Sequence, residues 1–306
     1  MIQASAPAKA ILFGEHAVVY GQPAIAVPVS DLRAFASVRP NSSGLRIASG
    51  KLTIPVDIDA ESVDNALALT ARLVLKELKL PPPAVTITIR SEIPIASGLG
   101  SGAAVSTALA RALCTQLDRT LDERTLNRLI YEVEKIHHGT PSGIDNSVIV
   151  YERPVYFVRG QTIEHLSIGV PFTLLIGDTG KSASTRAAVA GVRARYESDP
   201  AGVQLILNEI GDLVRKARTA IEGGELLTIG KLMMQNHGLL RRLTVSSPEL
   251  DALVEASERS GALGAKLSGG GRGGNMIALV TPQTQSQVES ALRAAGAVHV
   301  FTTEVR

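Results

Sequence analysis

The stretch "PIASGLGSGAAVSTALARAL", residues 94–113, places Gly98, Gly100 and Gly102 within five positions and then continues as a run rich in alanine, valine and leucine. Glycine allows a backbone to approach a ligand closely, and the start of a helix presents unpaired N–H groups and the positive end of the helix dipole. The stretch therefore predicts a tight turn that enters a buried helix. Taken alone, such a turn binds a dinucleotide, binds a nucleoside triphosphate, or binds nothing.

The surroundings of the glycines test the two ligand-binding options. Gly98, Gly100 and Ala103 fit the G-x-G-x-x-G/A pattern of dinucleotide-binding folds, and Asp118 lies 20 residues after Gly98. In those folds, a strand runs directly into the glycines and the acidic residue ends the following strand. Here residues 91–97, "SEIPIAS", intervene and a predicted helix follows Asp118, so we reject this option. No lysine follows the glycines, which excludes a Walker A loop but leaves phosphate binding at a helix start open.

Length and composition are those of an ordinary globular protein that handles small molecules. The chain has 306 residues, which favours two domains, with 45% apolar and 20% charged residues. A net charge of +2 and an aromatic content of 3% argue against a nucleic-acid partner. No apolar run reaches the roughly 18 residues of a membrane span, and we identify no signal peptide. Cys114 is the only cysteine, which excludes internal disulfides, so we expect a cytoplasmic location without membrane partners.

The order of the predicted elements favours an α+β fold. Strands are expected on both sides of a turn within residues 10–29, and in 84–91, 155–160, 171–180 and 299–305. Helices are expected near 64–80, 101–113, 123–138, 186–222, 225–242 and 248–260. Thr120 and Glu123 have the spacing of a capping box for the helix that follows them. Strands mixed with runs of consecutive helices are typical of α+β proteins. The polar stretch 160–169 predicts a boundary between domains 1–165 and 166–306.

Two further motifs accompany the glycine loop. "APAKAILFGEHAVVYG" (6–21), "GLGSGAAVS" (98–106) and "KLSGGGRGGNMIAL" (266–279) occur in this order, and together they resemble the three signature motifs of the GHMP kinases. The resemblance covers nearly the whole chain. It implies a two-domain α+β fold with the active site in the cleft between the domains, and ATP and Mg²⁺ as cofactors.

The resemblance also implies catalytic roles for two residues. Asp145 matches the aspartate that accepts or orients the proton of the acceptor hydroxyl, and Lys9 matches the lysine that pairs with it. From local sequence alone, Asp145 lies in a loop and could equally cap the next turn, and Lys9 could be a solvated residue beside a strand.

The remaining site residues follow from the same resemblance. The expected ATP-binding residues are Pro94, Gly98, Leu99, Gly100, Ser101, Gly102, Ala103 and Ser106. The expected Mg²⁺ ligands are Glu134 and Ser101. The expected substrate contacts are Glu15, His16, Thr140, Ser142, Gly270 and Gly271. One departure concerns Gly102, because the family usually has a metal-binding serine there; Ser101, Ser106 or water would have to replace it.

Residues 11–21, 136–148 and 235–254 resemble the family members that act on mevalonate. The resemblance thus implies transfer of the γ-phosphate of ATP to the 5-hydroxyl of mevalonate in isoprenoid biosynthesis. Alternatives are a related kinase for phosphomevalonate, homoserine or a sugar, or a non-catalytic binding protein with this fold. The presence of Lys9, Glu134 and Asp145 argues against the non-catalytic alternative. Mevalonate and ATP are the expected partners, with a homodimer as a further option.

Overall fold

The computed structural model describes residues 2–50, 52–55, 65–94, 98–138, 141–182 and 184–306. The chain forms two compact units, and each unit is built from several segments. The N-terminal unit comprises Met1–Ala8, Leu32–Pro94 and Gly100–Glu152, and the C-terminal unit comprises Lys9–Asp31, Ile95–Leu99 and Arg153–Arg306. Both units contain helices and strands, which confirms the α+β class. The boundary between residues 165 and 166 stays a prediction, because the compact units divide the chain at several other points.

The N-terminal unit contains strands in the order β4–β3–β5–β2, in which β3 and β5 are parallel and the other neighbours antiparallel. The alternation expected in β5 is confirmed, because Val85, Ile87 and Ile89 are buried while Thr88 and Arg90 are exposed. β1 and β2 contribute residues to both units. The strands are β1 (Ile2–Phe13), β2 (Ala24–Pro40), β3 (Arg46–Ser49), β4 (Leu52–Pro55) and β5 (Val85–Ser91).

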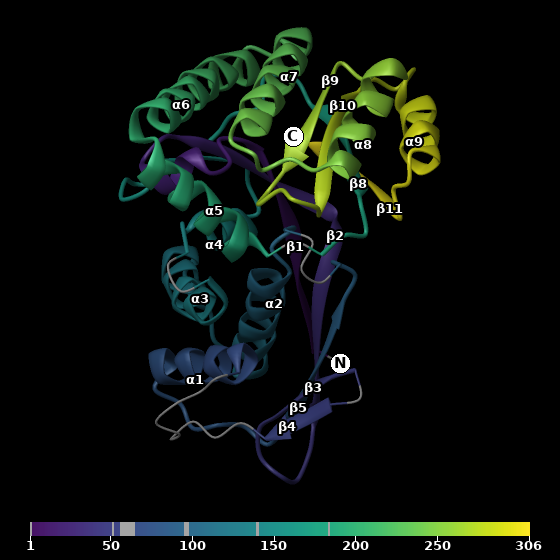
Figure 1. Cartoon of the computed structure of the whole chain (residues 1–306). Coiled ribbons are helices and arrows are strands. Elements are labelled where there is room, and N and C mark those ends of the chain that lie inside the picture. The colour runs from purple at the N-terminus through teal and green to yellow at the C-terminus, as the bar shows by residue number, and fades with distance from the viewer. Residues whose placement is uncertain (1, 51, 56–64, 95–97, 139–140, 183) are drawn as a thin grey trace. The chain divides into compact units, whose positions relative to one another are not determined.

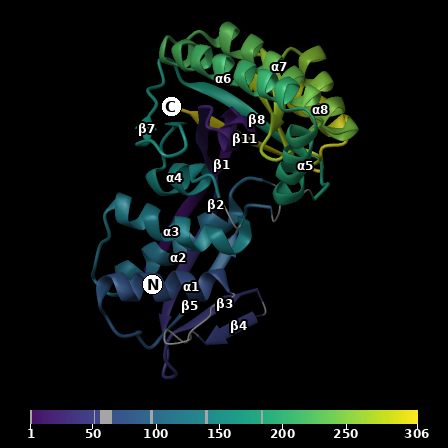
Figure 2. The same ribbon diagram turned by 60° about the vertical axis from the view of Figure 1, so that its left-hand side comes forward.

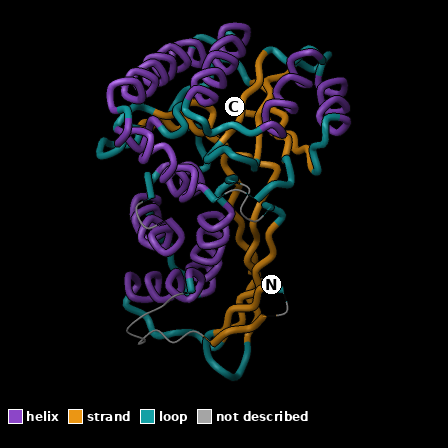
Figure 3. Tube along the Cα trace, viewed as in Figure 1, coloured by secondary structure: helices purple, strands orange, loops and turns teal. Residues whose placement is uncertain are grey.

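The helices of the N-terminal unit are α1 (Ala66–Leu78), α2 (Ser101–Gln116), α3 (Glu123–His138) and α4 (Ile144–Tyr151). The central helix is α2, which contacts α1, α3, α4 and β5, and Figure 3 shows the helices and strands of this unit segregated from one another. The predicted capping box is wrong in its N-cap residue. The carboxylate of Asp122, not the hydroxyl of Thr120, accepts the backbone N–H of Thr125 at 2.8 Å.

The helix α4 is an element that the sequence analysis did not predict. Its side chains are apolar or small around most of its circumference, and Ile144, Val148, Ile149 and Val150 are all buried. A helix buried on most sides lacks the alternation of polar and apolar faces on which sequence prediction relies. Asp145 therefore lies in the first turn of a helix rather than in a loop.

The C-terminal unit is built on a sheet in the order β11–β8–β10–β9, whose neighbours are all antiparallel. Figure 1 shows α8 and α9 beside this sheet, and Figure 2 shows α6 and α7 lying alongside each other. The strands are β6 (Val155–Phe157), β7 (Glu164–His165), β8 (Phe172–Asp178), β9 (Gly264–Ser268), β10 (Asn275–Val280) and β11 (His299–Val305). The helices are the 3₁₀ helix η1 (Ala17–Tyr20), α5 (Thr185–Ser198), α6 (Pro200–Glu222), α7 (Leu226–Arg242), α8 (Pro248–Arg259) and α9 (Gln285–Ala294).

The helical region expected over 186–222 is divided into α5 and α6. Asp199 separates the two helices, and its side chain accepts the backbone N–H of Gly202 at 2.9 Å, which caps α6. Pro200 occupies the first helical position, where its missing N–H breaks no hydrogen bond. The split therefore follows from a local Asp–Pro start signal within a longer apolar pattern.

Glycine allows α7 and β9 to approach each other closely. A Cβ atom on Gly230 would lie 2.1 Å from the carbonyl oxygen of Leu263, and one on Gly264 would lie 2.1 Å from that of Gly230. Neither position could hold a side chain without a shift of the backbone. This approach brings the later residues of α7, including Asn236 and His237, next to the strand that leads into the third glycine-rich motif. No helix among the described residues is long and apolar enough to span a membrane.

Candidate functional site

The glycine loop leads into α2 as predicted. Gly98 and Gly100 have φ values of 84° and 74°, a left-handed conformation that L side chains rarely adopt. Gly100 is the N-cap of α2, and neither a capping side chain nor an acidic residue stands at this helix start. The first helical hydrogen bond runs from the N–H of Ala104 to the carbonyl of Gly100 at 3.0 Å, so the N–H groups of Ser101, Gly102 and Ala103 have no acceptor within the helix. This helix start has the donors and dipole that favour an anion.

Lys9 is a buried residue of β1, with a relative exposure of 3%. Its backbone N–H donates to the carbonyl of Leu99 in the glycine loop at 3.0 Å. This position excludes the alternative of a solvated lysine beside the strand. The side chain of Leu99 is itself buried, so the predicted contact of Leu99 with a nucleotide would have to come from its backbone.

The third motif forms the loop between β9 and β10, and it contacts both of the other motifs within the C-terminal unit. The hydroxyl of Ser268 accepts the N–H of Ile11 at 3.1 Å and donates to the carbonyl of Ile11 at 2.9 Å. A Cβ atom on Gly269 would lie 3.6 Å from the carbonyl oxygen of Gly98. Parts of the three motifs, far apart in sequence, therefore meet in one unit.

His16 links the first motif directly to the third. Its Nε2 donates to the carbonyl of Gly270 at 2.9 Å, so the histidine is satisfied by a distant loop and not within its own turn. Burial lowers the pKa of His16 to about 4; the hydrogen bond to Gly270 opposes this shift, and the positive charge of Arg272 adds to it. At neutral pH the ring is therefore uncharged. Since the proton is on Nε2, Nδ1 acts as a hydrogen-bond acceptor.

Glu15 forms a buried ion pair with Lys266 of β9, and both residues have a relative exposure of 0%. Its second carboxylate oxygen accepts from the side-chain amide of Asn236 at 3.1 Å, and Lys266 also donates to the carbonyl of Leu267 at 2.6 Å. Burial lowers the pKa of Lys266, and the charge of Glu15 opposes that shift. Both carboxylate oxygens of Glu15 therefore have partners in the interior, and its contact with substrate stays a prediction.

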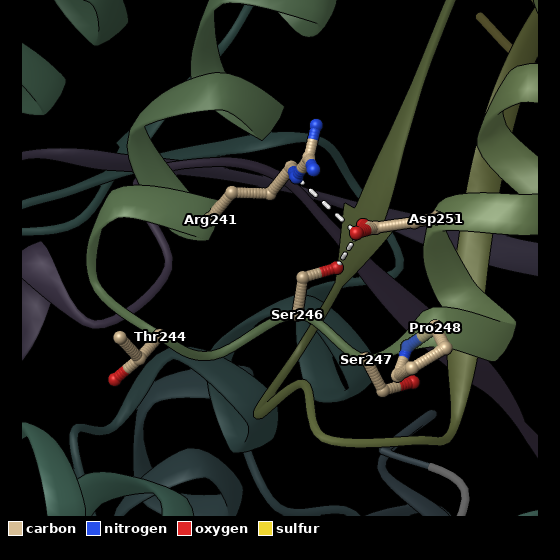
Figure 4. A pocket seen from close by; sticks show the side chains of 6 residues that line it. All are labelled: Arg241, Thr244, Ser246, Ser247, Pro248 and Asp251. Carbon is tan, nitrogen blue, oxygen red and sulfur yellow. Dashed lines mark hydrogen bonds and ion pairs between the residues drawn. The ribbon is translucent and has the colours of Figure 1, made fainter.

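A second polar network supports the third motif from α7 and α8. The Nε2 of His237 lies 3.2 Å from a carboxylate oxygen of Asp251, and Figure 4 shows Arg241 and Ser246 also directed at this carboxylate. A pocket of about 200 Å³ lies here, lined by Arg241, Thr244, Ser246, Ser247, Pro248 and Asp251. Its charged groups pair with one another, so we assign them to holding the segment 243–247.

That segment packs directly against the glycine-rich loop. The N–H of Arg272 donates to the carbonyl of Val245 at 2.7 Å, and a Cβ atom on Gly271 would lie 1.9 Å from the same oxygen. Close packing against Val245 therefore requires glycine at position 271, and the contact of Gly271 with substrate stays a prediction.

The N-terminal unit carries the predicted carboxylates. Glu134 of α3 has a relative exposure of 3%, and Asp145 in the first turn of α4 is half-buried. A carboxylate that is buried like Glu134 must be compensated by a hydrogen bond or a cation. Ser142, before α4, is half-buried and its hydroxyl accepts the N–H of Ile144 at 3.4 Å; Thr140 lies outside the described residues.

Ser106 is buried on α2, one helical turn after Gly102. Within the described part of the chain, its hydroxyl has no hydrogen-bond partner. The described residues also contain no cluster of three or more His, Cys, Asp or Glu side chains arranged to hold a metal.

Comparison with known proteins identifies the family. Models of the GHMP kinases N terminal domain and of the GHMP kinases C terminal match residues 65–153 and 217–298. The mevalonate kinase of Pyrococcus abyssi is 39% identical over 99% of this chain and 95% of its own length. The chain belongs to the GHMP kinase family.

Solved structures of GHMP kinases match the fold over 99% of this chain. The mevalonate kinase of L. major in complex with R-mevalonate matches with a TM-score of 0.86 and 29% identity, covering 99% of this chain and 95% of that one. The mevalonate kinase of Methanococcus jannaschii matches with a TM-score of 0.88 and 26% identity, covering 99% and 98%. The family predicted from the three motifs is confirmed.

The sequence analysis of this GHMP kinase gave no role to five residues of the stretches that carried the resemblance, namely Asn236, His237, Asp251, Lys266 and Arg272. Lys266 had one usable signal, because it is a lone charge in the otherwise apolar segment that becomes β9. Asn236 and His237 had no local pattern that indicated their contacts, since their partners lie in other elements and only the close approach of α7 to β9 brings them together.

Proposed function

We propose that this GHMP kinase is a mevalonate kinase that transfers the γ-phosphate of ATP to the 5-hydroxyl of mevalonate. The observation that carries the proposal is similarity along nearly the entire chain: proteins named mevalonate kinase from Pyrococcus and Thermococcus are 36–39% identical over 98% or more of it. The residues expected for this chemistry are present in buried or half-buried positions, as Lys9, Glu134 and Asp145 illustrate.

Phosphoryl transfer depends mainly on positioning the phosphates and stabilising their charge. In our proposal, the N–H groups at the start of α2, from Ser101 to Ala103, bind ATP phosphates. Asp145, in the first turn of α4, accepts or orients the proton of the acceptor hydroxyl. Lys9 provides positive charge for the aspartate and the reacting hydroxyl.

Two residues of the N-terminal unit fit a Mg²⁺ ion. The buried carboxylate of Glu134 offers negative charge, and the buried hydroxyl of Ser106 is a second oxygen ligand that has no protein partner in the described part of the chain. Ser106 stands one helical turn from Gly102, so we propose that it replaces the serine that the family usually has there, ahead of Ser101. When bound, Mg²⁺ neutralises charge on the phosphate oxygens.

The acceptor side of the proposed site includes His16, Gly270 and Ser142. Because the Nε2 of His16 is bonded to Gly270, the neutral ring accepts a hydrogen bond from a substrate hydroxyl through Nδ1. Thr140 stays a predicted contact. A cytoplasmic location and a homodimer stay predictions from the sequence.

The test is an assay of ADP release with mevalonate, phosphomevalonate, homoserine and galactose as acceptors, with the Asp145→Asn variant as the catalytic control. Mevalonate should give the highest kcat/KM, and loss of the general base should lower kcat by about 10²–10⁴-fold. Turnover of another acceptor with none of mevalonate would refute the proposed substrate. Full activity of Asp145→Asn would refute the catalytic role.

A further inference from the structure

Arg272 is an unusual residue in the loop between β9 and β10. It stands in the sequence "GGGRGG", residues 269–274, and is exposed. Its φ of 61° is in the left-handed region, which glycine adopts readily and L side chains rarely do. Because such a conformation persists only where the surroundings enforce it, an arginine here among five glycines calls for a reason.

The surroundings of Arg272 hold both its backbone and its side chain. Its N–H donates to the carbonyl of Val245 at 2.7 Å. Its guanidinium lies against α5 at Gly191, where an added Cβ atom would come within 2.4 Å of Nη2. Glycine at position 191 therefore leaves the space that the guanidinium occupies.

The loop that carries Arg272 also contacts His16, which belongs to the acceptor side of the proposed site. Gly270, two residues earlier, accepts the hydrogen bond from His16, and the charge of Arg272 contributes to the lowered pKa of that histidine. Among the residues that the structure describes, no side chain forms an ion pair or hydrogen bond with this guanidinium. Arg241 and Arg242 at the end of α7, in contrast, are paired with Asp251 and Glu209.

A hydroxy acid needs two kinds of partner, and His16 can supply only one of them. Its neutral Nδ1 presents a lone pair, which attracts a hydroxyl proton and repels a carboxylate. A guanidinium offers parallel N–H donors that match the two oxygens of a carboxylate. We propose that Arg272 binds the carboxylate of the acceptor acid while His16 accepts from one of its hydroxyl groups. This assignment rests on the proposed function.

The phosphate groups of ATP are the other source of anionic oxygens. Steady-state kinetics distinguish whether Arg272 binds these phosphates or the carboxylate of the acceptor. The variants are Arg272→Gln and Arg272→Gly, with Arg293→Gln as a control that removes one exposed positive charge from α9. The glycine variant keeps the left-handed backbone accessible, so thermal denaturation should show no loss of stability for it. The acceptors are mevalonate and its neutral analogue 3-methylpentane-1,3,5-triol, which lacks the carboxylate.

We expect both Arg272 variants to raise the KM for mevalonate by about 10- to 100-fold, as loss of a charge-assisted contact does. The KM for ATP and the kcat/KM for the triol should change by less than about threefold, and Arg293→Gln should behave as the wild type. A raised KM for ATP with an unchanged KM for mevalonate would assign Arg272 to the nucleotide and overturn the proposal. Unchanged constants for both substrates would overturn it as well.

Calorimetric titration with mevalonate tests the role of Arg272 separately from the proposed function. If the wild type binds mevalonate but phosphorylates a different acceptor, the proposed function fails, while a weaker affinity of the Arg272 variants still supports carboxylate binding. If the wild type phosphorylates mevalonate and the variants bind it equally well, only the role of Arg272 fails. No binding of mevalonate to the wild type would overturn both.

Discussion

Replacing either partner of the buried pair Glu15–Lys266 should destabilise the protein strongly, whereas replacing both should not. Both side chains have a relative exposure of 0%, and Asn236 provides the only other side-chain hydrogen bond to this pair within the described residues. The test uses Glu15→Gln, Lys266→Met and the double variant, whose side chains keep a similar volume without charge. The quantity compared is the free energy of unfolding at pH 7.

The expected magnitudes follow from burial of an uncompensated charge. In Glu15→Gln, the ammonium of Lys266 retains the carbonyl of Leu267 at 2.6 Å but loses its counter-charge. In Lys266→Met, the carboxylate of Glu15 retains only the amide of Asn236 at 3.1 Å. Removing one partner of a buried pair costs about 3–5 kcal/mol, which is a large part of the roughly 5–15 kcal/mol that stabilises a typical domain. Replacing both charges by neutral groups of similar volume is often neutral or stabilising.

Urea denaturation followed by circular dichroism measures all four proteins of this double-mutant cycle. The coupling free energy between the two positions should be at least about 3 kcal/mol, because the second substitution removes the charge that the first left unpaired. Single variants that each lose less than about 1 kcal/mol would refute the reasoning. Strictly additive losses would refute it too, since they would mean that the two charges do not compensate each other.

Two further expectations concern stability. Burial lowers the pKa of both His16 and His237 from 6.5 to about 4. Between these two pH values, the unfolded chain binds protons that the folded chain does not. The free energy of unfolding therefore falls as the pH falls through this range. Each histidine should contribute about 3 kcal/mol of this loss. Denaturation at pH 7 and at pH 4.5, where most of the loss has developed, measures it. A free energy of unfolding that is equal at the two pH values would contradict the lowered pKa of these histidines. Gly271→Ala should be about 2 kcal/mol more destabilising than Gly98→Ala, although both positions have positive φ. A Cβ atom at 271 would lie 1.9 Å from the carbonyl oxygen of Val245, whereas no atom of the described residues lies within 4 Å of one at 98. Equal melting temperatures for these two variants would show that the backbone at Val245 can shift away from the new Cβ atom without a loss of stability.

The features that the sequence predicted correctly are those encoded locally. The glycines at 98 and 100 require a left-handed turn, and the apolar residues that follow require a buried helix, so both elements could be predicted from a few adjacent positions. The alternation in β5 likewise reports which side chains are buried. Three ordered motifs then sufficed to predict the GHMP kinase family, because each constrains the backbone in a way that few other sequences reproduce.

Only the tertiary structure shows which distant groups the polar residues of the motifs contact. Glu15 and Lys266 are 251 positions apart, and His16 and Gly270 are 254 apart, so no local pattern could show that the first pair is sealed in the interior while the second joins two motifs. The helix α4 was hidden for a related reason, since burial on most sides removed the polar face that would have marked it. The sequence thus determined the turns, the strand alternation and the family. The roles of Glu15, His16 and Arg272 depend on which distant groups share their surroundings, because burial and neighbouring charge set their electrostatics, and only the folded chain brings those groups together.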